Sequence, residues 1–107
     1  SSAASDVYKR QIKQRVEKSR QIQLERFTWT KITFNSEMST KEINKYCQLD
    51  EESDKILKQA VSMLNLSARS YYRILKLART IADLDSKKNI KKEHILEALS
   101  FRKKEEN

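Results

Sequence analysis

The chain contains neither glycine nor proline among its 107 residues. Turns, phosphate-binding loops and strand-rich folds normally use both residues, so their absence argues against each of these features. A Gly-rich phosphate loop in particular cannot be built. Asn, Asp and Ser remain to form turns, and the length suffices for one small domain with one modest core. We therefore predict an all-α fold, a small bundle of about four to five helices.

Cysteine, histidine and long apolar runs are equally scarce. Cys47 and His94 are the only residues of their types, so an internal disulfide and a metal cage are both excluded. We interpret Cys47 as a small buried hydrophobe and His94 as a surface residue early in a helix. No apolar run approaches the roughly 20 residues that cross a bilayer, and no signal-type segment is present. The sequence predicts a soluble, cytoplasmic protein with no membrane partner.

The net charge of +8 is unevenly distributed along the chain. Residues 1–34 carry eight Lys or Arg against three Asp or Glu, residues 35–66 carry four against six, and residues 67–107 carry eleven against six. Two basic flanks therefore enclose an acidic middle. Basic flanks favour phosphate-rich partners through counterion release, although a solvated helical surface often has the same composition.

Local patterns predict the order of the helices. Residues 12–27 favour a helix with a partial apolar stripe. Residues 28–36 are rich in β-branched and aromatic side chains and indicate a connecting segment that its aromatic rings pin to the domain. Ser39 and Glu42 form a capping box that opens a short helix, and Asp50 caps the next helix.

Helical spacing predicts which residues of two of the helices face the core. In the helix after Asp50 we expect five inward residues, which are Ile56, Leu57, Ala60, Val61 and Leu64. A polar turn over residues 85–89 precedes the final helix, which starts raggedly because Lys91 stands where a Ser or Thr cap would be natural. Its expected inward residues are Ile95, Leu96, Ala98, Leu99 and Phe101. The end of the chain should fray.

One helix begins with a charge of the wrong sign. Ser67 is its predicted N-cap, so Arg69 lies in the first turn, where the helix dipole disfavours a cation by roughly 0.3 to 1 kcal/mol. The helix after Asp50 instead begins with Glu51 and Glu52. A helix N-terminus beside a guanidinium offers donors suited to phosphate oxygens, so Arg69 is a candidate anion site. A solvated arginine on an exposed turn is the alternative that physics leaves open.

One face of this helix is apolar and the opposite face is basic. Its predicted core face contains six residues, which are Tyr71, Ile74, Leu75, Ala78, Ile81 and Ala82. Arg69, Arg73 and Lys76 lie within about 60° of one another on the opposite face, with Arg79 to one side. This stripe either is solvated or faces phosphate or a neighbouring subunit. We favour solvent for Lys76 and function for Arg69.

An ordered set of residues between Ile12 and Lys103 resembles a known family. The set comprises Arg15, Val16, Arg20, Gln23, Arg26, Phe27, Asn35, Met38, Ser39, Cys47, residues 49–52, residues 66–69, residues 73–75, residues 78–84, Ile90, His94, Glu97, Ala98 and Arg102. It is similar to the C-terminal helical domain of the magnesium-chelatase-like AAA+ ATPases, with the competence-associated ComM/YifB branch most alike. A long ordered likeness of this kind is more specific than any single short motif.

The resemblance implies a role for the domain and for Arg69. In AAA+ ATPases a small helical lid closes over nucleotide, and Arg69 matches its sensor-2 arginine, which contacts the terminal phosphate. Arg73 and Arg79 are further candidates for interface or phosphate contacts. ATP and Mg²⁺ are implied for a full-length parent and no cofactor for the isolated fragment. This fragment lacks the phosphate loop and is not expected to be an enzyme alone.

The implied partners follow from the same family. They are an AAA+ core on the same chain, neighbouring subunits of a homo-oligomeric ring, and DNA, which the parent would remodel by branch migration during natural transformation. The alternative is a stand-alone basic helical module that binds nucleic acid or a protein partner. Steeply salt-dependent DNA binding by the isolated domain would favour that module, because such a slope counts phosphate contacts.

The sequence divides into four segments. Residues 1–11 resemble a translated sequencing-library adapter, and we interpret them as a non-native leader. Residues 12–38 form a helix and connecting segment that lead in from the missing ATPase core. Residues 39–103 form the helical lid domain, and residues 104–107 a frayed tail.

Overall fold

The computed structural model describes residues 2–105, with side-chain surroundings for residues 3–101. Its elements, in chain order, are α1 (Ser2–Arg26), the 3-10 turn η1 (Asn35–Glu37), α2 (Thr40–Tyr46), α3 (Glu51–Leu64), α4 (Ala68–Leu84) and α5 (Lys92–Glu105). Extended pairing in this part of the chain amounts to one isolated bridge between Leu49 and Ile90. The predicted all-α fold with about four to five helices is confirmed.

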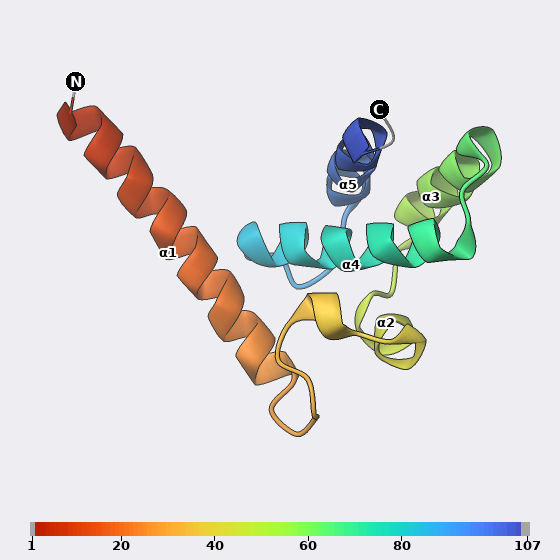
Figure 1. Cartoon of the computed structure of the whole chain (residues 1–107), viewed down its shortest axis with the longest axis horizontal. Helices are drawn as coiled ribbons and strands as arrows, with labels where there is room; N and C mark the ends of the chain where they lie inside the picture. The colour runs from red at the N-terminus through yellow and green to blue at the C-terminus, as the bar shows by residue number, and fades with distance from the viewer. Residues whose placement is uncertain (1, 106–107) are drawn as a thin grey trace.

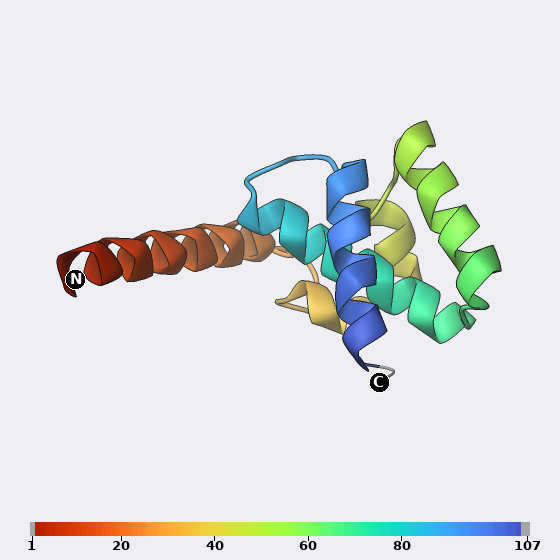
Figure 2. The ribbon, with the colours of Figure 1, turned by 90° about the horizontal axis from the view of Figure 1, so that it is seen from above.

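Helix α4 is the central element of the bundle. It packs against α1, η1, α2 and α5, while α3 packs against α5. Figure 1 shows α4 lying across the middle, with α5 rising from it, and Figure 2 shows α1 and α3 at opposite ends of the long axis. The central position follows from the predicted apolar face, since Ile74, Leu75, Ala78 and Ala82 are all buried.

The apolar core is formed by α2 to α5 and the segments between the helices, including Phe27 directly after α1. Its buried apolar members are Phe27, Met38, Ile43, Cys47, Leu57, Ile74, Leu75, Ala78, Ala82, Ile90, Ile95 and Ala98. The prediction of a buried Cys47 is confirmed, and this burial raises the pKa of its thiol to about 11. Phe27 and Tyr46 meet edge to face with ring centroids 5.4 Å apart, which joins the end of α1 to α2.

Local caps form as the sequence predicts. The backbone N–H of Ser39 donates to the Glu42 carboxylate at 2.8 Å, and the Asp50 carboxylate accepts from the Ser53 N–H at 2.8 Å. Two non-glycine residues adopt the left-handed conformation, Asn65 with φ 52° and Ser86 with φ 55°. Without glycine in the chain, these two positions make the tight changes of direction after α3 and α4.

The prediction that His94 lies on the surface is wrong. Its ring is 2% exposed, and its Nδ1 accepts a hydrogen bond from the Lys91 backbone N–H at 2.9 Å. Its Nε2 lies 3.0 Å from the Asp85 carboxylate. His94 therefore satisfies the backbone before α5, and this helix starts in an ordered way in spite of Lys91 at the cap position.

Several predicted inward apolar residues are exposed. Trp29 is 97% exposed and Phe34 is 46% exposed, so the aromatic rings do not pin the connecting segment. The half-buried Ile32 packs against the core in their place. Helical spacing also assigned three flanking residues to the core that are about half exposed, which are Leu64, Leu96 and Phe101.

Helix α1 is longer than predicted. It runs without interruption from Ser2, so residues 2–11 are helical, and residues 3–15 are exposed along it. Figure 1 shows this part of α1 extending beyond the end of α4. At the other end of the chain α5 continues to Glu105, so residues 104 and 105 of the predicted frayed tail (104–107) are helical, and residues 106 and 107 lie outside the described residues. Within residues 2–105, no helix combines the length and the apolar character needed to span a bilayer.

Candidate functional site

The first turn of α4 has the composition predicted for it. The Ser67 hydroxyl accepts from the Ser70 backbone N–H at 3.1 Å and so caps the helix. The turn contains no acidic residue, and the Arg69 side chain is exposed there. A guanidinium therefore stands at the positive end of a 17-residue helix with no carboxylate in the same turn. This arrangement favours an external anion.

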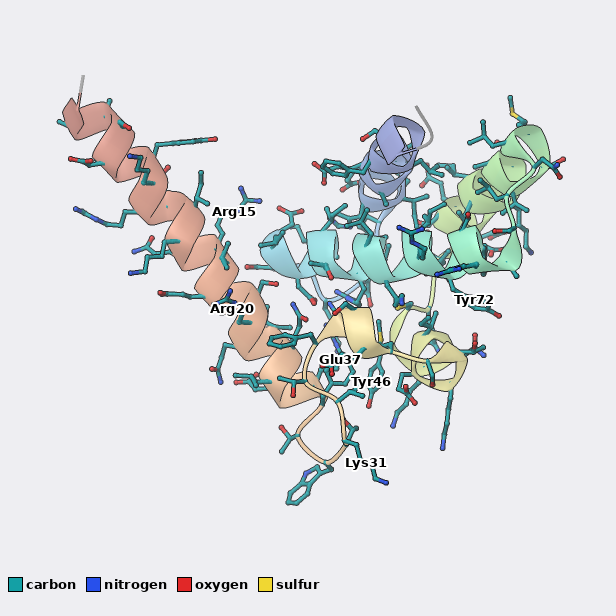
Figure 3. All side chains as sticks on the ribbon, in the orientation of Figure 1. Arg15, Arg20, Lys31, Glu37, Tyr46 and Tyr72 are labelled. Carbon is teal, nitrogen blue, oxygen red and sulfur yellow. The ribbon has the colours of Figure 1, made fainter. Side chains whose placement is uncertain are left out.

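A surface groove lies along this end of α4, and we call it the basic groove. Its volume is about 630 Å³. The lining residues are Met38, Ser39, Thr40, Ile43, Arg69, Tyr72, Arg73 and Lys76. The structure thus brings the three predicted cations of α4 against the segment that opens α2. Figure 3 shows Tyr72 on the α4 side of this region, above α2.

The electrostatics of the basic groove are one-sided. Among the residues whose side chains the structure describes, its lining includes three cations and no Asp or Glu. Like charges four residues apart on a helix destabilise it by a few tenths of a kcal/mol, and a bound anion removes that repulsion. Lys76 is half-buried and donates to the Ser36 carbonyl at 3.3 Å. Lys76, for which we favoured solvent, is thus partly exposed but also contacts the backbone of η1, and its charge adds to the groove.

Arg73 and Lys76 also line a second hollow of about 320 Å³. Its other lining residues are Ser36, Ser70, Ile74, Leu77, Thr80 and Ala98. The described lining of this hollow is thus partly apolar. The two hollows share their cations, so the positive potential extends from the start of α4 toward α5.

Arg79 lies in the interior, away from the basic groove. It is 4% exposed. Its guanidinium donates to the carbonyls of Lys87 and Lys88 at 2.8 and 3.0 Å, and it forms an ion pair with Asp83 at 3.1 Å. Burial lowers the pKa of Arg79, while the neighbouring Asp83 opposes that shift. In this structure Arg79 holds the loop between α4 and α5.

A buried polar network centred on Asp83 joins α1, η1 and α4, and the sequence patterns did not predict it. Arg26 donates to both oxygens of the Asp83 carboxylate. The Asn35 amide donates to Asp83 at 2.8 Å and to the Thr80 hydroxyl at 3.1 Å. The only sign of this network in the local sequence is that Arg79 and Asp83 are four residues apart on one helix, beside buried alanines. The partners of Asp83 on α1 and η1 lie 57 and 48 residues away in sequence.

Metal ligands do not gather in the part of the chain that the structure describes. Over residues 2–105, no three His, Cys, Asp or Glu side chains are close enough together to hold a metal ion.

Comparison with known proteins gives a consistent set of relatives. The family model described as "Magnesium chelatase, subunit ChlI C-terminal" matches residues 8–102. The chain is 40% identical over 92 residues to the "Competence protein ComM" of Haemophilus influenzae and 37% identical over 91 residues to the "Uncharacterized protein YifB" of Escherichia coli. These matches cover 86% and 85% of the chain but 17% of each relative. The chain thus spans about one sixth of the length of these curated relatives, and the matched region contains both the basic groove and the Asp83 network.

Proposed function

The chain belongs to the family of magnesium chelatase subunit ChlI C-terminal domains, and from that membership we propose that Arg69 is the sensor-2 arginine of an AAA+ ATPase lid. In this proposal the domain closes over a nucleotide that a core domain outside this chain holds. The observation that carries it is an exposed arginine in the first turn of α4, a turn without an acidic residue, beside a groove that Arg73 and Lys76 also line.

The residues of the basic groove fit the terminal phosphate of ATP. A phosphate oxygen placed there meets the Arg69 guanidinium, whose planar donors suit it, and the positive end of the α4 dipole. Arg73 and Lys76 add positive potential along the same wall. ATP with Mg²⁺ supplies the phosphoanhydride bond that is hydrolysed. Arg69 stabilises the charge that spreads over the terminal phosphoryl oxygens, which is the usual protein contribution to this reaction.

The domain also communicates the nucleotide state. Contact between Arg69 and a phosphate favours one lid position, and loss of that phosphate removes the contact. A phosphate held by Arg69 is either on the same subunit or on the neighbouring subunit of a ring. The chain's partners are accordingly its own AAA+ core and adjacent subunits.

The proposal extends to the substrate of the whole protein. One relative is named a competence protein, and we infer that the parent uses ATP to remodel DNA in the branch migration of natural transformation. The basic flanks of this chain support a nucleic-acid substrate through their charge.

The test uses a chimera of the Haemophilus influenzae relative in which residues 12–103 of this chain replace its matching segment. Once this chimera hydrolyses ATP, Arg69→Ala should lower kcat by about 100-fold or more, since removing one preorganised donor has that effect in other enzymes. Because Arg69 is exposed, the thermal midpoint should stay the same. Steady-state turnover and thermal unfolding are measured on the same samples.

Two variants serve as controls. Lys55→Ala removes an exposed cation from α3 that does not line the groove, and it should leave turnover unchanged. Arg69→Lys keeps the charge but loses the planar donors, so it should recover only part of the rate. Full turnover in the Arg69→Ala chimera would reject the sensor-2 assignment.

A further inference from the structure

The side chain of Trp29 is 97% exposed, although tryptophan is among the residues that gain most from burial. It lies in the loop between α1 and η1, over residues 27–34. Trp29 is also the only tryptophan of the chain. A large ring fully in water contributes nothing to the core, so its position calls for an external partner.

The loop that carries Trp29 is held by hydrogen bonds on both sides of the ring. The Thr28 hydroxyl donates to the Leu24 carbonyl at 3.0 Å. The Thr30 hydroxyl donates to the Phe27 carbonyl at 2.9 Å and accepts from the Ile32 N–H at 3.3 Å. These bonds fix the backbone before and after Trp29, so its exposure is built into the loop.

The far end of the loop is fixed as well. The Glu37 carboxylate accepts from the backbone N–H groups of Thr33 and Phe34 at 3.0 and 2.8 Å. The half-buried Ile32 packs against the core beneath. A preorganised exposed ring loses little conformational entropy when it binds, which is typical of a recognition residue.

The surroundings of Trp29 are polar. The exposed neighbours in the loop are mainly polar, namely Thr28, Thr30, Lys31 and Thr33, with Phe34 46% exposed at its end. Figure 3 shows Lys31 at the end of this loop, pointing away from the bundle. A protein-binding hot spot normally lies in a patch of packed apolar side chains. Hydroxyls and an ammonium around a single ring are instead suited to a base with its sugar and phosphate.

Helix α1 leads into this loop with a strongly basic exposed surface. Between residues 9 and 20 it carries six exposed Lys or Arg and one acid, Glu17. Lys13 and Arg20 are seven residues apart, which places them on one face about 10 Å from each other along the helix. Figure 3 shows Arg20 on α1 between its free end and the loop. A line of cations therefore runs along α1 toward the exposed ring.

We propose that the Trp29 loop and the basic face of α1 bind single-stranded nucleic acid. Trp29 stacks on an unpaired base, while Lys13, Arg20 and Lys31 contact phosphates of the same strand. Proteins that bind single strands commonly combine a positively charged track with a stacking aromatic ring. The contact requires neither Arg69 nor ATP, so it is independent of the sensor-2 assignment.

The experiment uses the natural fluorescence of the chain. Because Trp29 is the only tryptophan, its emission reports on this site alone. Titration of the full 107-residue chain with an oligothymidylate of about 12 nucleotides should quench that emission in a saturable way. The same sequence in a duplex should quench much less, because its bases are already stacked. Absence of quenching by the single strand overturns the proposal, and it is the outcome expected if a protein is the partner of the loop.

Variants then separate stacking from charge, with anisotropy of a labelled oligothymidylate as the readout. Trp29→Ala should weaken binding by about 5- to 150-fold, the range expected for loss of one stacked base, and Trp29→Phe should recover part of it. The thermal midpoint of Trp29→Ala should match that of the parent chain, since the ring makes no core contact. Equal affinity of the parent chain and Trp29→Ala overturns the proposal.

The charged residues are tested by salt dependence. Lys13→Ala and Arg20→Ala should each reduce the slope of log affinity against log salt by about 0.7, the value for one phosphate of a single strand. The matched control Lys55→Ala lies on α3 at the other end of the molecule and should keep the full slope. An unchanged slope in both α1 variants overturns the assignment of the basic face.

Discussion

Arg26 binds Asp83 through two parallel hydrogen bonds, each 2.7 Å long. The Asp83 side chain is completely buried, and Arg26 is 12% exposed, so the pair is largely removed from water. Arg79 contacts the same carboxylate at 3.1 Å. One buried acid thus pairs with guanidinium groups from α1 and α4 and joins the last turns of these two helices.

Replacing Asp83 with alanine should therefore be severely destabilising. Two arginines would lose their shared carboxylate, and Arg79 would remain buried without its counter-charge. Removal of one partner from a buried pair typically costs about 3 to 5 kcal/mol. Urea unfolding followed by circular dichroism measures this cost. As a matched control, Asp54→Ala removes an exposed pair with Lys58 and should cost less than about 1 kcal/mol. Similar losses in the two variants would contradict the central role of Asp83.

Two leucines of α3 provide a test of its packing. Leu57 is completely buried, whereas Leu64 is 49% exposed. Leu57→Ala should cost about 2 to 5 kcal/mol in the free energy of unfolding because it leaves a cavity. The same change at Leu64 should cost less than about 1 kcal/mol. A large loss at Leu64 would show that this end of α3 is covered in solution.

Glycine at position 86 should stabilise the fold. Ser86 has φ 55°, a conformation that is unfavourable for most residues with a Cβ atom. Ser86→Gly removes that strain and should raise the free energy of unfolding by up to about 1 kcal/mol after the entropy of the unfolded chain is deducted. Asn65 has φ 52°, but asparagine tolerates this region, so Asn65→Gly should change stability by only a few tenths of a kcal/mol. Chemical denaturation compares the two, and a loss of stability in Ser86→Gly would disprove the strain.

The free energy of unfolding should decrease at acidic pH because the carboxylates that cap helices become protonated. Hydrogen bonds from the Ser39 backbone and hydroxyl lower the pKa of Glu42 below its ordinary value. Because the pKa of Glu42 is lower in the folded state, the ionised carboxylate contributes fully to stability above its ordinary pKa. That contribution is lost as the pH falls through the lowered pKa of the folded state. Glu42→Gln should therefore flatten the dependence of the urea midpoint on pH between about 5 and 3. A slope identical to that of the parent chain would exclude this contribution.

The helix starts were predictable because their chemistry is local. Ser39, Asp50 and Ser67 each bond to a residue three positions later, and such patterns are visible in sequence. The central face of α4 was equally accessible, since a 17-residue helix repeats its apolar spacing several times.

The predictions of burial fail where contacts with other parts of the fold determine whether a side chain is exposed. His94 is buried because Asp85 and the Lys91 backbone supply its polar partners, and neither contact has a sequence signature. Leu96 was assigned inward by spacing but is 52% exposed, because spacing gives a direction and not the presence of a neighbouring helix. For Trp29, β-branched and aromatic composition suggested packing, whereas the hydrogen bonds of Thr28 and Thr30 hold the ring outward.

The candidate site was also predictable from the sequence only in part. Arg69, Arg73 and Lys76 were placed on one face of α4 from helical periodicity, and they line one groove. The participation of Ser39 and Ile43 in that groove depends on how α2 folds against α4, which the sequence does not encode locally. Arg79 was not recognised as an interior residue because its carbonyl partners belong to the loop after α4.

Helix α4 carries Arg69 in its first turn and Asp83 in its last, about 21 Å apart along one uninterrupted axis. A regular helix resists bending, so it behaves as a stiff rod between these two points. Any tilt imposed at the Arg69 end must reappear as a swing of the opposite sense at Asp83, where the bidentate bond passes it to α1. Under the sensor-2 role that we propose for Arg69, contact with a phosphate at the first turn of α4 would thus change the angle at which α1 leaves the bundle, without a hinge within α4.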